Sequence, residues 1–121
     1  MYTAAPDSFS LDLCFWNVEG IVRNRLAIQY IFQNFAQVVC LSELNGPDSS
    51  ISIVLQECPS IRFCSSDESE TNSGRSAILW KSDLDPVITQ CPYPSQSIAC
   101  IKIALESTTP IHLVSVYAYS R

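Results

Sequence analysis

The sequence predicts an α/β domain in which helices cover a β-sheet. Two apolar segments of strand length, 11–18 and 37–44, flank a segment whose apolar residues recur at helical spacing. Two later pairs of segments have the pattern of β-hairpins. The chain has 121 residues, of which 47% are hydrophobic and only 3 are glycine, so it is long enough to bury a core.

The first part of the domain is predicted as strand, helix, strand. Segment 11–18 has apolar residues on both alternating faces, and segment 37–44, QVVCLSEL, is almost continuously apolar. Such strands are typical of a parallel sheet that is covered on both sides. From residue 23 to residue 35 the apolar residues recur every three or four positions, which predicts a helix. A right-handed crossover through this helix would make the two strands parallel neighbours.

The rest of the chain predicts four strands and a weak helix. Turn signals at 45–48 precede a weakly amphipathic segment at 51–57. IRFCSS (61–66) and SAILWKS (76–82) are predicted to form a hairpin around a polar loop, whose acidic residues we interpret as solvated. SIACIKIAL (97–105) and PIHLVSVYAY (110–119) alternate and predict an antiparallel hairpin. We expect residues 1–10 to be a flexible leader and 11–121 to be one domain or part of one.

Composition argues against several classes of protein. The net charge of −5 is unsuited to a broad basic surface, so a polyanion would have to be bound locally or through a metal. The six cysteines lack C-x-x-C spacing and His112 is the sole histidine, which argues against a structural zinc site. We interpret His112 as a surface residue and Cys14 and Cys40 as reduced, buried thiols. Without a signal-peptide pattern or a bilayer-spanning run, we expect an intracellular protein, cytoplasmic or nuclear, with no membrane partner.

Two polar residues end the two apolar strands. Asn17 ends the first and Glu43 the second, and a glycine, Gly20 or Gly46, follows each of them three residues later. Parallel strands end at one edge of a sheet, where ligands of open α/β sheets bind. A carboxylate and an amide suit Mg²⁺, which takes few protein ligands. Alternatively, Asn17 caps its own backbone and Glu43 marks where the strand leaves the core; the spacing does not decide.

Four segments occur in the order of a known family: FWNVEG (15–20), VVCLSEL (38–44), SGRSAILWKSDL (73–84) and IHLVSVYAYSR (111–121). They resemble the motifs W-N-x-x-G, L-Q-E, G-G-x-A-I-L and V-x-x-x-Y-x-P of the N-terminal half of the endonuclease/exonuclease/phosphatase superfamily, which has the deoxyribonuclease I-like fold. The resemblance covers residues 11–121 and is nearest to the endonuclease domains of non-long-terminal-repeat retrotransposons. It implies part of a two-sheet β-sandwich flanked by helices.

The resemblance also implies a Mg²⁺-dependent phosphodiesterase, with Mn²⁺ as an alternative metal and DNA as the favoured substrate over other phosphoesters. Asn17 matches the family's asparagine near the metal and the phosphate, and Glu43 matches its metal-binding glutamate. Tyr117 matches the tyrosine that points toward the phosphate, although a core or cross-strand aromatic is an equal alternative. Ser42 replaces the usual glutamine, Arg75 stands where a second glycine is frequent, and the proline after the tyrosine is absent.

The family's second half, with its G-D-x-N segment and terminal S-D-H, has no counterpart in this sequence. We therefore expect this chain alone to lack the general base and to be inactive. The alternative functions are a non-catalytic remnant or binding module of the same fold, and a phosphatase acting on non-nucleic phosphoesters. Because the central strands are apolar on both faces and the chain offers one good covering helix, we also expect an uncovered apolar sheet face and self-association.

Overall fold

The computed structural model describes residues 10–105 and 109–118, so the predicted leader, apart from its last residue, lies outside the described residues. The described elements, in chain order, are β1 (Leu13–Asn17), α1 (Arg25–Asn34), β2 (Val38–Ser42), α2 (Asp48–Leu55), β3 (Ile61–Ser65), β4 (Ser76–Lys81), the 3₁₀ helix η1 (Ser82–Val87), β5 (Ile88–Gln90), β6 (Ile98–Ile103) and β7 (Ile111–Val116). None of the described helices is long and apolar enough to cross a membrane.

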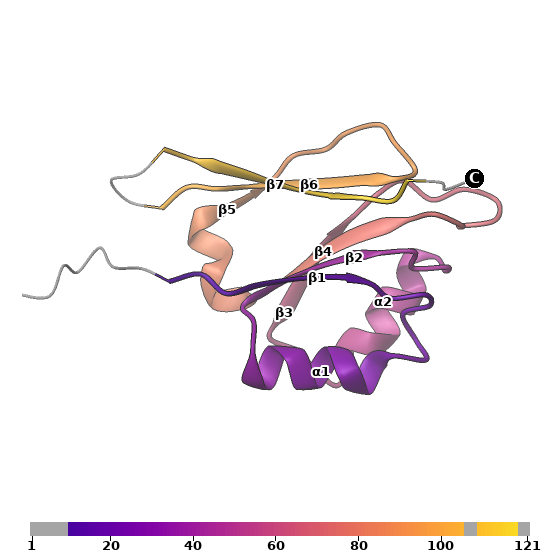
Figure 1. The fold of residues 1–121 in the computed structure, drawn as a ribbon, viewed down its shortest axis with the longest axis horizontal. Coiled ribbons are helices and arrows are strands. Elements are labelled where there is room, and N and C mark those ends of the chain that lie inside the picture. Colours follow the sequence, from indigo (N-terminus) through magenta and orange to yellow (C-terminus); the bar gives the residue numbers. More distant parts are fainter. Residues whose placement is uncertain (1–9, 106–108, 119–121) are drawn as a thin grey trace, which may run out of the picture.

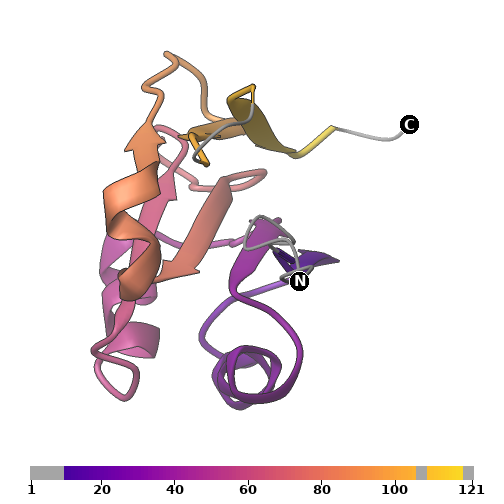
Figure 2. The ribbon, with the colours of Figure 1, turned by 90° about the vertical axis from the view of Figure 1, so that its left-hand side faces the viewer.

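The elements form three layers (Figure 1). The middle layer is a four-stranded sheet of order β1-β2-β4-β3, in which β1 is parallel to β2 and the other pairs are antiparallel. Helices α1 and α2 cover one face of this sheet, and the antiparallel sheet β5-β6-β7 lies over the other face. Figure 2 shows the same layers from the side. The predicted two-sheet sandwich with flanking helices is confirmed.

Alternation along β2 divides its side chains between two cores. Val39 and Leu41 pack in the core between the middle sheet and the helices. Val38 and Cys40 pack in the core between the two sheets. All four side chains are buried, which confirms the prediction of a central strand covered on both faces. Each buried aliphatic side chain contributes about 1.5–3 kcal/mol relative to an exposed one.

The predicted elements are confirmed with changed bounds. Helix α1 begins at Arg25, because residues 21–24 form a turn, and α2 begins at Asp48, directly after Pro47. The two predicted hairpins are the antiparallel pairs β3–β4 and β6–β7. Strand β5 and helix η1 are additional, since segment 82–90 has too short an apolar pattern to predict either element.

The expectation of an uncovered sheet face is wrong for the central strands. The sheet β5-β6-β7 belongs to the same chain and covers them, so that Val38 and Ile78 are fully buried. Exposed apolar side chains remain at the margin, where Phe15 of β1 and Val114 and Val116 of β7 line a common hollow and are 62%, 43% and 52% exposed. We call these three residues the β1/β7 seam. Among the described residues, β1 and β7 are edge strands.

Candidate active site

Strands β1 and β2 end side by side. In their parallel register Asn17 lies opposite Ser42, and the pairing continues beyond it. The N–H of Val18 donates to the Ser42 carbonyl oxygen at 2.9 Å. The N–H of Gly20 donates to the Glu43 carbonyl oxygen at 3.0 Å. The structure therefore places Asn17, which is exposed, and Glu43, which is half-buried, on neighbouring strand ends, as the sequence predicts.

The backbone around this edge is unusual. Glu43 has a φ of +60°, in the left-handed region that costs a non-glycine residue about 1–2 kcal/mol. Strained residues of this kind persist where the surrounding structure holds them, often at functional sites. The facing loop turns at Gly20, whose φ of +102° suits glycine. The Asn24 amide donates to the carbonyl oxygens of Val18 and Gly20 at 2.7 and 2.9 Å, which fixes that loop.

A buried arginine fixes the loop that follows Glu43. The Arg75 side chain is fully buried. The backbone carbonyl oxygen of Arg75 accepts a hydrogen bond from the N–H of Leu44 at 3.1 Å. Its guanidinium donates to the carbonyl oxygens of Gly46 (3.0 Å), Asp67 (3.2 Å) and Ser66 and to the carboxylate of Asp48 (2.8 Å). From the sequence alone, Arg75 is identified only as a departure from a family motif. The one sequence feature that could indicate its role is a positively charged residue directly before an apolar strand.

The strand ends open onto a hollow between the two sheets. Its volume is about 380 Å³, and its lining residues are Phe15, Trp16, Asn17, Cys40, Ser42, Val114, Ser115 and Val116. The buried Ser115 hydroxyl donates to the Leu41 carbonyl oxygen at 2.9 Å, which joins β7 to β2. Polar side chains from β1, β2 and β7 therefore line one hollow at this edge.

Tyr117 follows β7 directly and is half-buried. Its N–H donates to the Ser97 carbonyl oxygen at 3.0 Å. Because Ser115 and Val116 line the hollow, the end of β7 reaches the same edge as the ends of β1 and β2 (Figure 1). The contact of Tyr117 with a phosphate stays a prediction.

Two other residues, His112 and Cys40, are candidates for chemistry, and Cys40 lines the hollow described above. His112 is exposed near the start of β7, as expected for a surface histidine. Cys40 is buried, and burial, with a smaller contribution from Cys14, raises its pKa to about 12. It therefore stays a protonated thiol at neutral pH. The prediction that Cys14 is buried is wrong, since Cys14 lies on the edge strand β1 and is only half-buried.

The carboxylate of Glu43 and the amide oxygen of Asn17 are oxygen donors of the kind that Mg²⁺ takes in proteins. No hydrogen bond or ion pair within residues 10–105 and 109–118 uses the Glu43 carboxylate or the Asn17 amide. The capping of its own backbone by Asn17 is therefore not seen. The same residues contain no group of three His, Cys, Asp or Glu side chains that could hold a metal. Mg²⁺ does not require one, since it often takes one or two carboxylates and keeps several waters.

The same arrangement of sheets and helices occurs in solved structures. The chain superposes on the endonuclease domain of TRAS1, a telomere-specific non-LTR retrotransposon, with a TM-score of 0.65 and 19% identity over 90% of this chain. The chain has a deoxyribonuclease I-like fold. It also superposes on a variant of the 3′ phosphatase NExo from Neisseria bound to product DNA hairpin, with a TM-score of 0.59 and 12% identity over 89% of this chain.

The chain spans 46% of the TRAS1 structure and 41% of the NExo structure, which is less than half of each. No protein-family model and no curated protein matches the sequence. At these identities the likeness shows the fold alone, because one fold supports many reactions. The reaction must therefore be argued from Asn17, Glu43 and their surroundings.

Proposed function

We propose that this chain forms the metal- and phosphate-binding edge of a divalent-metal-dependent phosphodiesterase, an endonuclease that cleaves DNA. The observation that carries the proposal is the position of Asn17 and Glu43 on neighbouring strand ends of a deoxyribonuclease I-like fold. The TRAS1 domain is an endonuclease and the NExo structure holds a DNA hairpin, which supports DNA as the substrate. With a net charge of −5, the chain would depend on local groups and a metal to bind phosphate.

Each site residue has a distinct role in this proposal. Glu43 would hold Mg²⁺, or Mn²⁺ in its place, through its carboxylate, and Asn17 would orient a water molecule or a phosphate oxygen. Tyr117 would donate its phenolic O–H to the phosphate. The metal, when bound, supplies positive charge that offsets the charge developing on the phosphate. Two backbone hydrogen bonds, from the Gly20 N–H to the Glu43 carbonyl oxygen and from the Leu44 N–H to the Arg75 carbonyl oxygen, keep the Glu43 loop in place before a substrate arrives.

Water attack on a phosphodiester also needs a general base. No residue of this sequence matches the family's base, and we propose that a second segment supplies it. The β1/β7 seam is the surface on which we propose that this segment packs. Its apolar side chains are exposed, and they lie on the two strands that also line the hollow beside Asn17. Burial of the seam would stabilise the assembly, because apolar area removed from water contributes about 25 cal/mol per Å².

A plasmid-nicking assay in Mg²⁺ tests the proposed function. For the 121-residue chain alone we expect no cleavage. For a longer reading frame that includes this chain we expect Mg²⁺-dependent nicking, which is lost in Glu43→Gln. The charge-matched control is Glu57→Gln, since Glu57 is exposed beyond α2 and its carboxylate accepts from the Gln29 amide at 2.7 Å.

Two outcomes would contradict parts of the proposal. Near-normal nicking by Glu43→Gln would refute the role of the carboxylate. Metal-dependent nicking by the 121-residue chain, abolished by Glu43→Gln, would show that no second segment is needed.

A further inference from the structure

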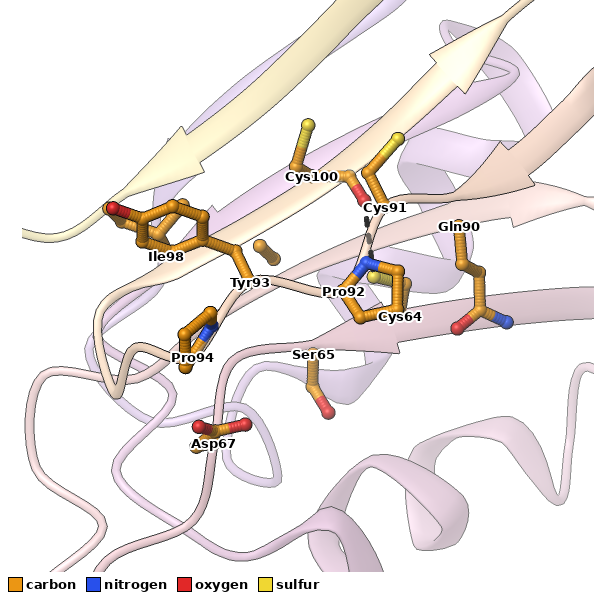
Figure 3. Close-up of a pocket in the computed structure, with 11 residues that line it drawn as sticks. Cys64, Ser65, Asp67, Gln90, Cys91, Pro92, Tyr93, Pro94, Ile98 and Cys100 are labelled. Carbon is orange, nitrogen blue, oxygen red and sulfur yellow. Dashed lines mark hydrogen bonds between the residues drawn. The ribbon is translucent and has the colours of Figure 1, made fainter.

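Two cysteines lie side by side on the outer face of the sheet β5-β6-β7. In the antiparallel register of β5 and β6, Gln90 lies opposite Ile101. One step further along, the N–H of Cys91 donates to the Cys100 carbonyl oxygen at 3.0 Å. Opposite residues of an antiparallel pair place their side chains on the same face. Figure 3 shows the Cys91 and Cys100 sulfur atoms on one side of the sheet.

This pairing meets the geometric needs of a disulfide. Hydrogen-bonded partners on antiparallel strands have Cα atoms about 5.5 Å apart. Disulfides join residues whose Cα atoms are about 4.4–6.8 Å apart. Both cysteines are half-buried, so a small solute can reach them. Burial raises the pKa of Cys100, and the neighbouring Cys91 raises it further, as expected for two thiols close together.

Cys14, Cys40 and Cys64 lack such a partner on their own face. Cys64 is close to this pair, but it packs in the core between the two sheets, where its thiol donates to the Cys100 carbonyl oxygen at 3.5 Å. The same contact is drawn in Figure 3. Cys14 and Cys40 lie on neighbouring strands but on opposite faces, since Cys14 packs toward the helices and Cys40 toward the second sheet. Their side chains therefore point apart.

We propose that Cys91 and Cys100 form a reversible disulfide site that is oxidised by a low-molecular-weight disulfide such as oxidised glutathione. One cysteine thiolate attacks a sulfur of the oxidant, forms a mixed disulfide and releases one glutathione thiol. The second cysteine thiolate then attacks the protein sulfur of that mixed disulfide and releases the other glutathione. The two cysteines lose two electrons and two protons in total, and the oxidant gains them as two thiols.

The cross-link has a local structural consequence. It closes the segment 92–99, and several residues of this segment line a hollow of about 370 Å³ (Figure 3): Pro92, Tyr93, Pro94, Ile98 and Ala99. A disulfide across neighbouring strands stabilises the fold mainly by constraining the unfolded chain. We therefore expect the oxidised chain to melt at a higher temperature than the reduced chain. Because the pair is on an open sheet face, we also expect a mild thiol reductant to reverse the reaction.

Peptide mapping tests the proposal directly. The folded chain is incubated with oxidised glutathione in mildly alkaline buffer, quenched with acid, alkylated and digested with trypsin. Cleavage after Lys81 and Lys102 gives peptide 82–102, which contains Cys91 and Cys100 and no other cysteine. We expect most of this peptide to lack alkyl groups and to be lighter by two hydrogen atoms than its reduced, unalkylated form. Dithiothreitol added before alkylation should restore two alkyl groups.

Variants and alternative products make the result decisive. Cys91→Ser should leave Cys100 as a lasting glutathione adduct, whereas Cys58→Ser should give the wild-type pattern. The proposal is overturned by a wild-type peptide 82–102 with two alkyl groups, or by one with a glutathione on each cysteine. A cross-link between peptides 63–75 and 82–102 also overturns it, since that product would make Cys64 the partner.

Discussion

The N–H of Gly20 donates to the carbonyl oxygen of Glu43 at 3.0 Å, which joins the loop after β1 to the residue that follows β2. Both residues have positive φ values, so the bond connects two turns that ordinary extended strands would not make. Asn17 and Glu43 are held at one edge of the sheet by this pair of turns.

The first prediction concerns Arg75, whose fully buried side chain donates to the carbonyl oxygens of Gly46, Ser66 and Asp67 and to the Asp48 carboxylate. Arg75→Ala should lower the free energy of unfolding by about 3–5 kcal/mol, because it leaves buried acceptors and a carboxylate without their partner. Arg75→Lys should also destabilise the fold, since an ammonium cannot reach all of these acceptors. Urea denaturation measures both losses.

The matched control for this prediction is Arg62→Ala. Arg62 is 53% exposed and its ion pair with Asp85, at 3.2 Å, is also exposed, so its loss should change the unfolding free energy far less. Equal effects of Arg62→Ala and Arg75→Ala would show that the buried network does not hold the loop.

The second prediction is a pH dependence that comes from Cys40. The pKa of this thiol is raised from 9.0 to about 12 in the folded chain, so above pH 9 the unfolded chain releases a proton that the folded chain keeps. The stabilisation is therefore fully present below pH 9 and is lost as the pH rises toward about 12. Denaturation at increasing alkaline pH should show a steeper loss of stability in the wild type than in Cys40→Ala. If the stability of the wild type and of Cys40→Ala falls equally steeply with rising pH, Cys40 is not the source of the pH dependence.

The third prediction concerns the β1/β7 seam. Phe15→Ser should reduce self-association and the binding of a hydrophobic dye, because it removes the most exposed apolar side chain of the seam. Thermal stability should hardly change, since surface substitutions usually alter it within about 0.5 kcal/mol. Sedimentation velocity and dye fluorescence are the measurements.

Phe35 provides a control of almost equal exposure, 63% against 62% for Phe15. It lies at the end of α1 and contacts the ring of Tyr30, on the helix side of the molecule. If Phe35→Ser lowers self-association as much as Phe15→Ser does, the seam is not the associating surface.

Much of the site could be predicted from the sequence, because strand ends are local features. The apolar runs before Asn17 and Glu43 stop at polar residues, and the predicted helix between them favours a parallel crossover. The direction of the strands then puts both residues at one edge. The left-handed backbone of Glu43 has no such local signal, since glutamate rarely adopts it and the surrounding contacts impose it.

The parts that could not be predicted depend on contacts distant in sequence. Arg75 reaches Gly46 and Asp48 across more than 25 residues, and nothing near it in the sequence indicates either partner. The covering of the middle sheet by β5-β6-β7 was missed for a similar reason. Alternation along β6 shows that one face is buried, but not against which sheet.

The central claim, that Glu43 and Asn17 bind a divalent metal, is tested most directly by Mn²⁺ titration of the isotope-labelled chain, since bound Mn²⁺ broadens the NMR signals of nearby amides. We expect selective broadening at 17–20 and 42–45 in the wild type and in Glu57→Gln, weaker broadening in Asn17→Ala, and none in Glu43→Gln, because this substitution removes the charged group of the proposed site. The same selective broadening in Glu43→Gln, or its absence in the wild type, would contradict the account.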